Sequence, residues 1–197
     1  MDRNQVDIAL KGGAAIMVAA AAAAEAQDLQ GIYGGLSYTR GEGEIIDGSA
    51  VYAFDGNAVG GFVGYNHVVG DWVFGGELAF SNGEYLLEEA TDSPDISARN
   101  MLDIKVRFGR VFGKTLAYGV VGRSDFEFTI DAGGEEVSDG SATAIGLGFE
   151  APIGSKGFVG GEYLMRKDLK LNGNDAQSYA SGGSELNTLS LRMGLRF

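Results

Sequence analysis

The sequence predicts an all-β fold in which eight antiparallel strands run up and down in chain order and close into a barrel. Three observations support this prediction. From Gln30 onward, segments with alternating apolar and polar residues recur about eight times, and no helical period extends over a dozen residues. Glycine supplies 33 of the 197 residues and proline only 2, which suits closely packed, curved strands and excludes collagen. The connections between the segments are alternately long and short.

Composition restricts the function further. The net charge of −12 argues against binding to nucleic acid. The chain has no cysteine, so there is no disulfide framework and no thiolate metal site. With 45% hydrophobic and 10% aromatic residues the chain can bury a large apolar surface, which excludes a disordered chain.

The N-terminal segment differs from the rest. Residues 12–24 read GGAAIMVAAAAAA, an apolar stretch that follows Arg3 and Lys11 and precedes Glu25 and Ala26. Ala24 and Ala26 give the A-x-A form of a signal-peptidase site. About 13 residues are too few to span a bilayer as a helix, which needs roughly 20.

We therefore expect a cleaved export signal over residues 1–26 and a barrel domain over residues 27–197. The alternative is an alanine-rich helix that is not an export signal. Asp2 and Asp7 favour this alternative slightly, because they weaken the positive charge that precedes the apolar stretch.

The predicted strands alternate with two kinds of connector. The strands cover residues 30–40, 56–66, 72–82, 98–112, 116–129, 141–151, 158–170 and 187–197. The long connectors cover residues 41–55, 83–97, 130–140 and 171–186, and the short ones lie around Gly70, at 113–115 and at 152–157. Antiparallel neighbours joined in this way place every long connector at one end of the sheet and every tight turn at the other.

Alternation assigns a face to the side chains of each strand. The second strand is ambiguous because Phe62 lies opposite Val63 and Tyr65. From the third strand on, the predicted apolar face contains Trp72, Phe74, Leu78 and Phe80; Leu102, Ile104, Val106 and Phe108; Leu116, Tyr118, Val120, Phe126 and Phe128; Ile145, Leu147 and Phe149; Val159, Tyr163 and Met165; Leu189, Leu191, Met193, Leu195 and Phe197.

The opposite face carries nearly balanced charges. Its acids are Glu77, Asp103, Asp125, Glu127, Glu150, Glu162 and Asp168, and its bases are Lys105, Arg107, Arg123, Arg166, Arg192 and Arg196. In a soluble ligand-binding barrel the apolar face would point inward, whereas in a membrane barrel it would point to lipid and the charges would fill the lumen. Periodicity alone does not separate the two.

Other features favour the membrane barrel. The alternating connectors, the export signal and strands of about 10 to 14 residues suit outer-membrane spans. Aromatic residues gather near both ends of the apolar faces, as in interfacial girdles. They are Trp72, Phe112, Tyr118 and Phe197 near the short turns, and Tyr38, Phe80 and Phe128 near the long connectors. We expect the lumen charges to pair with one another and to fill the interior of an eight-stranded barrel.

The segments GIYGGLSY and VGGFVGYNHVVGDWVFGGELAFS and the ending LSLRMGLRF carry a family resemblance. In them the sequence resembles the small eight-stranded outer-membrane β-barrels of Gram-negative bacteria, the OmpA/OmpX-like group and particularly the surface-antigen barrels of alphaproteobacteria. The resemblance extends from Leu29 to Phe197. It implies that the last strand closes onto the first and is the signal read by the outer-membrane insertion machinery. The signal residues would be Leu191, Met193, Leu195 and Phe197. Alternatively Phe197 anchors the barrel at the interface, and both roles can hold together.

An enzymatic function finds little support. The one histidine, His67, is predicted in the short HVVGD turn without a serine and an acid beside it, as a catalytic triad would require. No phosphate loop, zinc spacing or nucleophile elbow is visible. We expect no enzyme activity, no cofactor and no specific metal site.

The long connectors contain 15 acidic residues and no lysine or arginine. Such a rim can simply be solvated, or it can bind divalent cations weakly beside anionic lipopolysaccharide. The residues for weak binding would be Glu88, Glu89, Asp92, Glu135, Glu136 and Asp139. They lack the regular spacing of a dedicated calcium loop.

These observations predict a non-enzymatic, monomeric outer-membrane barrel with both termini in the periplasm. Its role would be structural or surface-facing: envelope integrity, adhesion or recognition through acidic extracellular loops. Its partners would be outer-membrane lipid, lipopolysaccharide and the insertion machinery, and no nucleic acid. One alternative is a small cation-preferring channel or porin in the same barrel. Another is a soluble lipocalin-like binder, which would need no detergent.

Overall fold

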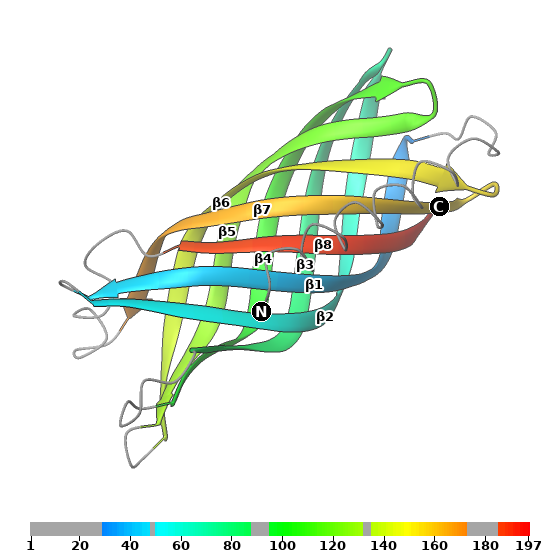
Figure 1. Cartoon of the computed structure of the whole chain (residues 1–197). Helices are drawn as coiled ribbons and strands as arrows, with labels where there is room; N and C mark the ends of the chain where they lie inside the picture. Colours follow the sequence, from blue (N-terminus) through cyan, green and yellow to red (C-terminus); the bar gives the residue numbers. More distant parts are fainter. Residues whose placement is uncertain (1–28, 48–49, 88–94, 132–134, 173–184) are drawn as a thin grey trace, which may run out of the picture.

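Figure 1 shows the computed structural model of the chain, in which tilted strands wrap around a common axis and close into a barrel. The structure describes residues 29–47, 50–87, 95–131, 135–172 and 185–197. The expected export signal over residues 1–26 lies outside these ranges. Within the described ranges, no helix has the length and apolar character that crossing a membrane would require.

Each strand is antiparallel to the next, and the last strand pairs with the first to close the barrel. The predicted fold class is therefore confirmed. The strands are β1 (Gly31–Asp47), β2 (Ala50–Val69), β3 (Trp72–Leu87), β4 (Asp95–Phe112), β5 (Thr115–Asp131), β6 (Glu135–Ile153), β7 (Gly157–Asn172) and β8 (Glu185–Arg196).

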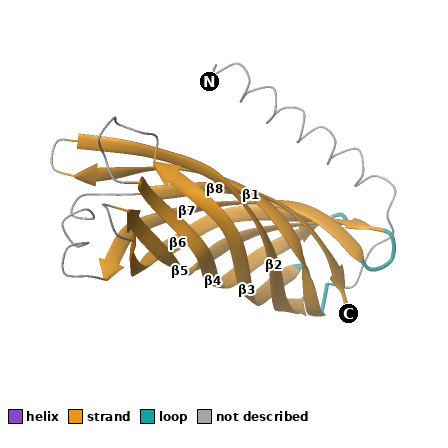
Figure 2. Cartoon of the chain, turned by 90° about the horizontal axis from the view of Figure 1, so that it is seen from below, coloured by secondary structure: helices purple, strands orange, loops and turns teal. Residues whose placement is uncertain are grey.

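Three tight turns define one end of the barrel, which we call the short-turn end. Gly70 follows β2, Gly113 follows β4 and Gly154 follows β6, with φ angles of 59°, 62° and 63°. Glycine adopts this left-handed conformation without the steric penalty of a Cβ atom. The turns lie where the sequence predicted them, and in Figure 2 they are drawn in teal near the labelled C-terminus.

At the opposite end, which we call the hairpin end, the strands continue into segments predicted as long connectors. β1 continues to Asp47 and β2 begins at Ala50, so the predicted connector 41–55 is mostly a paired hairpin. Likewise β5 and β6 pair through most of residues 130–140. The prediction ended these strands too early because glycines and acids are typical of loops, whereas backbone pairing does not require an apolar face.

The barrel closes along the seam between β1 and β8. Their register pairs Tyr33 with Arg196, and the Phe197 N–H donates to the Ile32 carbonyl at 2.9 Å. The predicted pairing of the last strand with the first is thus confirmed. Gly35 lies inside this seam, where an added Cβ would overlap the Met193 carbonyl oxygen and lie 2.7 Å from the Phe62 ring.

The two surfaces of the barrel differ in character. Large apolar side chains are exposed on the outside along most of each strand, and polar ones replace them toward the hairpin end. On β2, Phe62 points inward and Val63 and Tyr65 point outward, which resolves the ambiguity of that strand. Large outward apolar residues include Leu36, Val63, Leu78, Ile104, Val106, Ile145, Leu147, Leu191 and Met193.

β5 is turned the other way from the prediction. Leu116, Tyr118, Val120 and Phe126 are buried in the interior, and the outward face carries Ala117, Gly119 and Val121. The side chain of Phe128 lies outside the described residues. Tyr118 therefore does not belong to an outer aromatic girdle, whereas Trp72, Phe112 and Phe197 are exposed at the short-turn end. The interior of a narrow barrel needs large side chains to fill it, and those of β5 supply them.

Candidate functional site

The lumen contains a connected set of buried charged side chains, which we call the central network. Each of them is at most 5% exposed. They are Glu77, Lys105, Arg107, Glu150, Glu162, Arg192 and Arg196. An isolated charge is very unfavourable in such surroundings, so the pairing of these groups decides whether the barrel is stable.

Four members form a ring of alternating charge, which we call the charge ring. The Lys105 ammonium lies 2.7 Å from a Glu77 oxygen and 2.6 Å from a Glu162 oxygen. The Arg192 guanidinium contacts the same two carboxylates at 2.5 Å each. Because these residues come from β3, β4, β7 and β8, the ring crosses the lumen and obstructs it.

Arg107 extends the network toward the short-turn end. Its guanidinium lies 3.0 Å from Glu77 and 2.6 Å from Glu150. Glu150 also forms an ion pair with Arg196, with 2.8 Å between the guanidinium nitrogen and the carboxylate oxygen. Both oxygens of Glu150 thus have a cationic partner. The central network as a whole contains three acids and four bases.

Aromatic side chains surround the guanidinium groups. The Tyr33 hydroxyl donates to Glu77 at 2.8 Å and accepts from Arg107 at 2.5 Å. The Tyr118 hydroxyl donates to Glu162 at 3.1 Å, and its ring lies 3.9 Å from the Arg107 guanidinium. The Phe62 ring lies 4.0 Å from the guanidinium of Arg192. These cation–π contacts help to compensate for the water that the buried cations have lost.

A second ion pair lies nearer the hairpin end. Arg166 contacts Asp103 at 2.9 Å, and its other donors reach the hydroxyls of Ser124 at 2.8 Å and Thr188 at 2.7 Å. Ser124 also donates to Asp103. A cavity of about 30 Å³ lies between this pair and the charge ring and is lined in part by Tyr85. That volume holds about two water molecules, which is far from a continuous pore.

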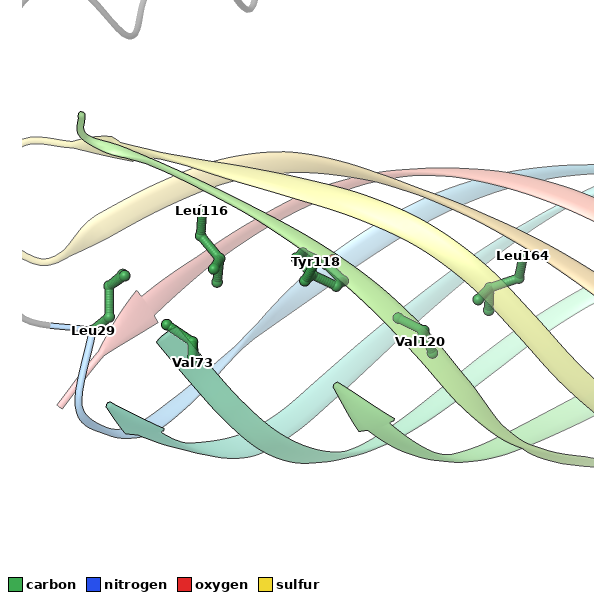
Figure 3. Packing of buried hydrophobic residues seen from close by; sticks show 6 residues of the cluster. All are labelled: Leu29, Val73, Leu116, Tyr118, Val120 and Leu164. Atoms are coloured by element: carbon green, nitrogen blue, oxygen red, sulfur yellow. The ribbon is translucent and has the colours of Figure 1, made fainter. Parts of the chain in front are cut away.

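The short-turn end of the lumen is closed by apolar side chains. Leu29, which precedes β1, is 9% exposed and packs with Val73 and Leu116. We call these three side chains the apolar lid, and Figure 3 shows them gathered at the end of the barrel, with Val120 farther along β5.

Gln30 and Gly31 hold the lid in position. The Gln30 carboxamide accepts from the Val68 N–H at 2.7 Å and donates to the Tyr65 hydroxyl at 2.7 Å. Gly31 has a φ of 119°, a conformation that side-chain-bearing residues rarely adopt. The chain can therefore turn from β1 into the mouth of the barrel, so that Leu29 faces the lumen.

Not all residues predicted for the lumen lie there. Arg123, Asp125 and Glu127 lie on the outer face of β5 toward the hairpin end, and Arg123 pairs with Asp125 at 2.8 Å. The side chain of Asp168 lies outside the described residues. The remaining predicted residues are buried inside: Glu77, Asp103, Lys105, Arg107, Glu150, Glu162, Arg166, Arg192 and Arg196.

The other predicted site residues have different positions. The residues of the proposed insertion signal, Leu191, Met193, Leu195 and Phe197, are exposed on the outside of β8 and at its end. His67 lies on β2 opposite Phe74, not in the turn, and its side chain is exposed.

The acidic residues predicted for divalent cations mostly fall outside the described part. This applies to Glu88, Glu89 and Asp92, and to the side chains of Glu135 and Glu136, whereas Asp139 is exposed. Among the side chains that the structure describes, no group of three or more His, Cys, Asp or Glu is arranged to hold a metal ion.

Sequence reasoning missed the neutral partners of the network. Tyr33, Tyr118, Ser124 and Thr188 each satisfy a buried charge, and Leu29 closes one end. Ser124 offered a signal, since it interrupts the supposedly apolar face of β5. Leu29 offered none, because its position depends on the path of the chain before it enters β1.

A closed antiparallel barrel with an apolar exterior and paired charges inside defines a class, the outer-membrane type of transmembrane barrel. The chain belongs to the outer membrane protein beta-barrel domain family, whose model matches residues 12–197. It is therefore an outer-membrane β-barrel protein. No curated protein matches the chain closely enough to count as a relative.

Solved structures show the same fold. Ail, the attachment invasion locus protein of Yersinia pestis, is 17% identical with a TM-score of 0.54, covering 85% of this chain and 99% of that one. Its complex with the heparin analogue sucrose octasulfate matches at 16% identity and a TM-score of 0.53, with the same coverage. Neisserial surface protein A is 12% identical with a TM-score of 0.55, covering 85% of this chain and 98% of that one.

Proposed function

We propose that this chain is a non-enzymatic, monomeric scaffold that presents acidic hairpins at the cell surface for adhesion or recognition. The obstructed lumen is the observation that carries the proposal. The charge ring crosses the barrel, and the apolar lid lies in series with it. A barrel blocked twice serves as a support for what it displays.

The length of the strands supports a role at the surface. A tilted strand needs about 9 to 11 residues to cross the hydrocarbon core, whereas β2 has 20 and β4 has 18. The excess lies toward the hairpin end, where the outward residues are polar, including Arg40, Glu42 and Asp55. The hairpins therefore project well beyond the membrane.

The orientation belongs to the proposal. Outer-membrane barrels have short periplasmic turns and longer extracellular loops. The short-turn end holds both Leu29 and Phe197, so both termini would lie in the periplasm. The last strand would also be the segment read by the insertion machinery, with Leu191, Met193, Leu195 and Phe197 accessible on its outer side.

Charge restricts the partners. Among the similar structures, one attachment protein is solved with the heparin analogue sucrose octasulfate, an anion. Residues 41–55, 83–97, 130–140 and 171–186, which were predicted as the long connectors at this end, contain 15 acids and no lysine or arginine, so a sulfated polysaccharide is a poor match. We infer a cationic partner, or an anionic one bridged by divalent cations through residues such as Glu88, Glu89, Asp92, Glu135, Glu136 and Asp139.

The conductance of the folded protein in a planar bilayer, with a salt gradient across it, tests the proposal. We expect no discrete steps above those of a protein-free bilayer. Discrete cation-selective steps that disappear after unfolding would instead support the channel. Cell adhesion is the second test: exchange of residues 41–55 and 83–97 for short polar turns should abolish binding while the barrel still folds.

A further inference from the structure

We propose that the cavity between the charge ring and the Arg166–Asp103 pair is a binding site for a small inorganic anion such as chloride. The anion accepts hydrogen bonds from Tyr85, Arg192 and Lys105, and it acts as a counter-ion inside the lumen. The site lies within the barrel, so this inference is independent of the proposed role at the cell surface.

The cavity exists because small side chains occupy inward positions on three strands. They are Ser37 and Thr39 on β1, Ala79 and Ser81 on β3, and Ser190 on β8. The lumen of an eight-stranded barrel is normally filled by side chains, so small ones around one point leave a space. This space of about 30 Å³ admits a monatomic anion, alone or with a water molecule, but not an organic anion such as gluconate.

The Tyr85 side chain reaches this cavity from β3. A Cβ added at Gly41 on β1 would lie 2.5 Å from the Tyr85 ring, so the glycine makes room for it. Tyr85 is 2% exposed, and its hydroxyl has no hydrogen-bond partner in the part of the chain that the structure describes. Because buried polar groups in folded proteins are nearly always hydrogen-bonded, this hydroxyl indicates a guest in the cavity that accepts its proton.

Two cations supply further donors at the cavity. The Nε–H of Arg192 is buried and has no partner among the described residues, since the terminal nitrogens make the contacts with Glu77 and Glu162. The Lys105 ammonium has three donors, of which two face the same carboxylates, so one remains. Both side chains line the cavity together with Tyr85. The cavity therefore offers several hydrogen-bond donors to a guest.

The carboxylates around the cavity are already engaged. They belong to Glu77, Asp103 and Glu162, and each of their oxygens lies within 3.2 Å of a lysine or arginine nitrogen. A metal cation at this place would meet three basic side chains without a free carboxylate to compensate for them. The arrangement thus selects a guest that accepts hydrogen bonds and carries no positive charge.

The buried charges favour an anion over water alone. Among the buried side chains that the structure describes, the bases outnumber the acids by one. The bases are Lys105, Arg107, Arg166, Arg192 and Arg196, and the acids are Glu77, Asp103, Glu150 and Glu162. Excess charge is unfavourable in a buried site, so an anion that balances it stabilises the folded barrel. Water offers acceptor oxygens but leaves the charge unbalanced.

Anomalous diffraction locates the anion. Crystals of the barrel refolded and grown in sodium bromide are compared for the wild type and for Tyr85→Phe, which keeps the ring and removes the donor. We expect one bromide peak in the cavity, in contact with the Tyr85 hydroxyl, and no such peak in the variant. A cavity that holds only water in the wild type would overturn the proposal.

Urea unfolding in lipid vesicles measures whether the anion binds the folded barrel. An ion that binds only the folded state raises the unfolding midpoint as its concentration increases. We expect the wild type to unfold at a higher urea concentration in sodium chloride than in equimolar sodium gluconate. In Tyr85→Phe this difference should disappear. The midpoint of the variant in gluconate should equal that of the wild type, because the substitution removes no hydrogen bond among the described residues.

Tyr163→Phe is the matched control, because Tyr163 lies on the outer face of the barrel. It should keep the full difference between chloride and gluconate, and the change in gel mobility on heating verifies that both variants fold. An equal difference in all three proteins would be a general salt effect and would overturn the proposal. A bromide peak without chloride-dependent stability would be an adventitious ion only, which also overturns it. Conductance and cell adhesion are measured separately, so failure of the proposed function is distinguishable from failure of the anion site.

Discussion

The carboxylate of Glu77 has cations on both of its oxygens. Lys105 contacts one oxygen, and Arg107 and Arg192 contact the other. Removing the charge of Glu77 leaves three buried cations, each with one ionic partner fewer. The loss of one partner from a buried ion pair is more unfavourable than the loss of an exposed pair, because the remaining charge cannot be hydrated.

We predict that Glu77→Gln lowers the free energy of unfolding by about 3–5 kcal/mol. Urea unfolding in detergent micelles or lipid vesicles measures the effect. The control is Glu42→Gln, which changes an exposed pair with Arg40 at 3.6 Å and should have an effect below about 1 kcal/mol. Equal effects of the two variants would show that the charge ring does not stabilise the barrel.

Glycine at position 35 is required by the closing seam. An added Cβ would overlap the Met193 carbonyl oxygen of β8 and lie 2.7 Å from the Gly194 Cα, so β1 and β8 would have to separate. We predict that Gly35→Ala destabilises the barrel by about 1–3 kcal/mol or prevents its closure. Gly76→Ala, on the outside of β3 with free space, should leave the free energy of unfolding within about 0.5 kcal/mol of the wild type.

At the level of whole strands, β4 and β5 show what alternation predicts and where it fails. On β4, apolar Ile104 and Val106 alternate with Asp103, Lys105 and Arg107, and the faces are as predicted. On β4 the charged residues determine which face points inward, because Lys105 and Arg107 lie within the apolar part of the barrel and cannot point to lipid.

On β5 the charged residues gave the wrong face. Arg123, Asp125 and Glu127 lie beyond most of the apolar exterior, where outward charges meet water or headgroups. The part of β5 that lies deeper has no charge on either face: Tyr118 and Val120 alternate with Gly119 and Val121. The size of the side chains decides the orientation of this part, because the larger side chains are needed to fill the lumen. A pattern of apolar and polar residues contains no information on size.

β8 carries the proposed insertion signal, and the exposure of Phe197 allows a direct test. Phe197 is 75% exposed, and its N–H, not its ring, pairs with β1. We predict that Phe197→Ala slows assembly by the insertion machinery while the rate of unassisted refolding into detergent changes little. Phe112→Ala removes another exposed aromatic ring at the same end and should affect neither rate. If both variants slow assembly equally, the ring of Phe197 is only an interfacial anchor.

For the whole molecule, the charge ring and the apolar lid form two barriers in series. We predict that two variants each show no conductance steps in a planar bilayer. One is Leu29→Gly, and the other replaces all four residues of the charge ring, Glu77, Lys105, Glu162 and Arg192, by alanine. The ring substitution removes two acids and two bases, so it does not change the net charge. The combined variant should show discrete conductance steps.

The combined variant is also the positive control for the wild type, since it shows that an inserted barrel is detectable. Steps from the Leu29 variant alone would show that the charge ring is permeable to ions. In that case the lid would be the only barrier, and the scaffold proposal would lose its main support.

Strand number, order and the short turns were predictable because glycine and alternation mark each of them in the chain. The inner pairings were not, since they depend on which residues of distant strands share a level of the barrel. Arg192 meets Lys105 across Glu77 and Glu162 only because of the stagger between β4 and β8. The projecting hairpins were also missed, since acidic and glycine-rich pairs of strands have the composition of loops.

The seam between β1 and β8 also determines how the chain must fold. Tyr33 pairs with Arg196, so the last inter-strand ladder joins the two extremes of the domain and has the greatest loop-closure entropy. Every partly formed sheet exposes two edges with unpaired backbone groups, which are templates for aggregation in water and intolerable in lipid. We therefore expect the closing of this seam to be the last step of folding, and a chain that loses its last few residues to remain an open sheet that quality-control proteases degrade.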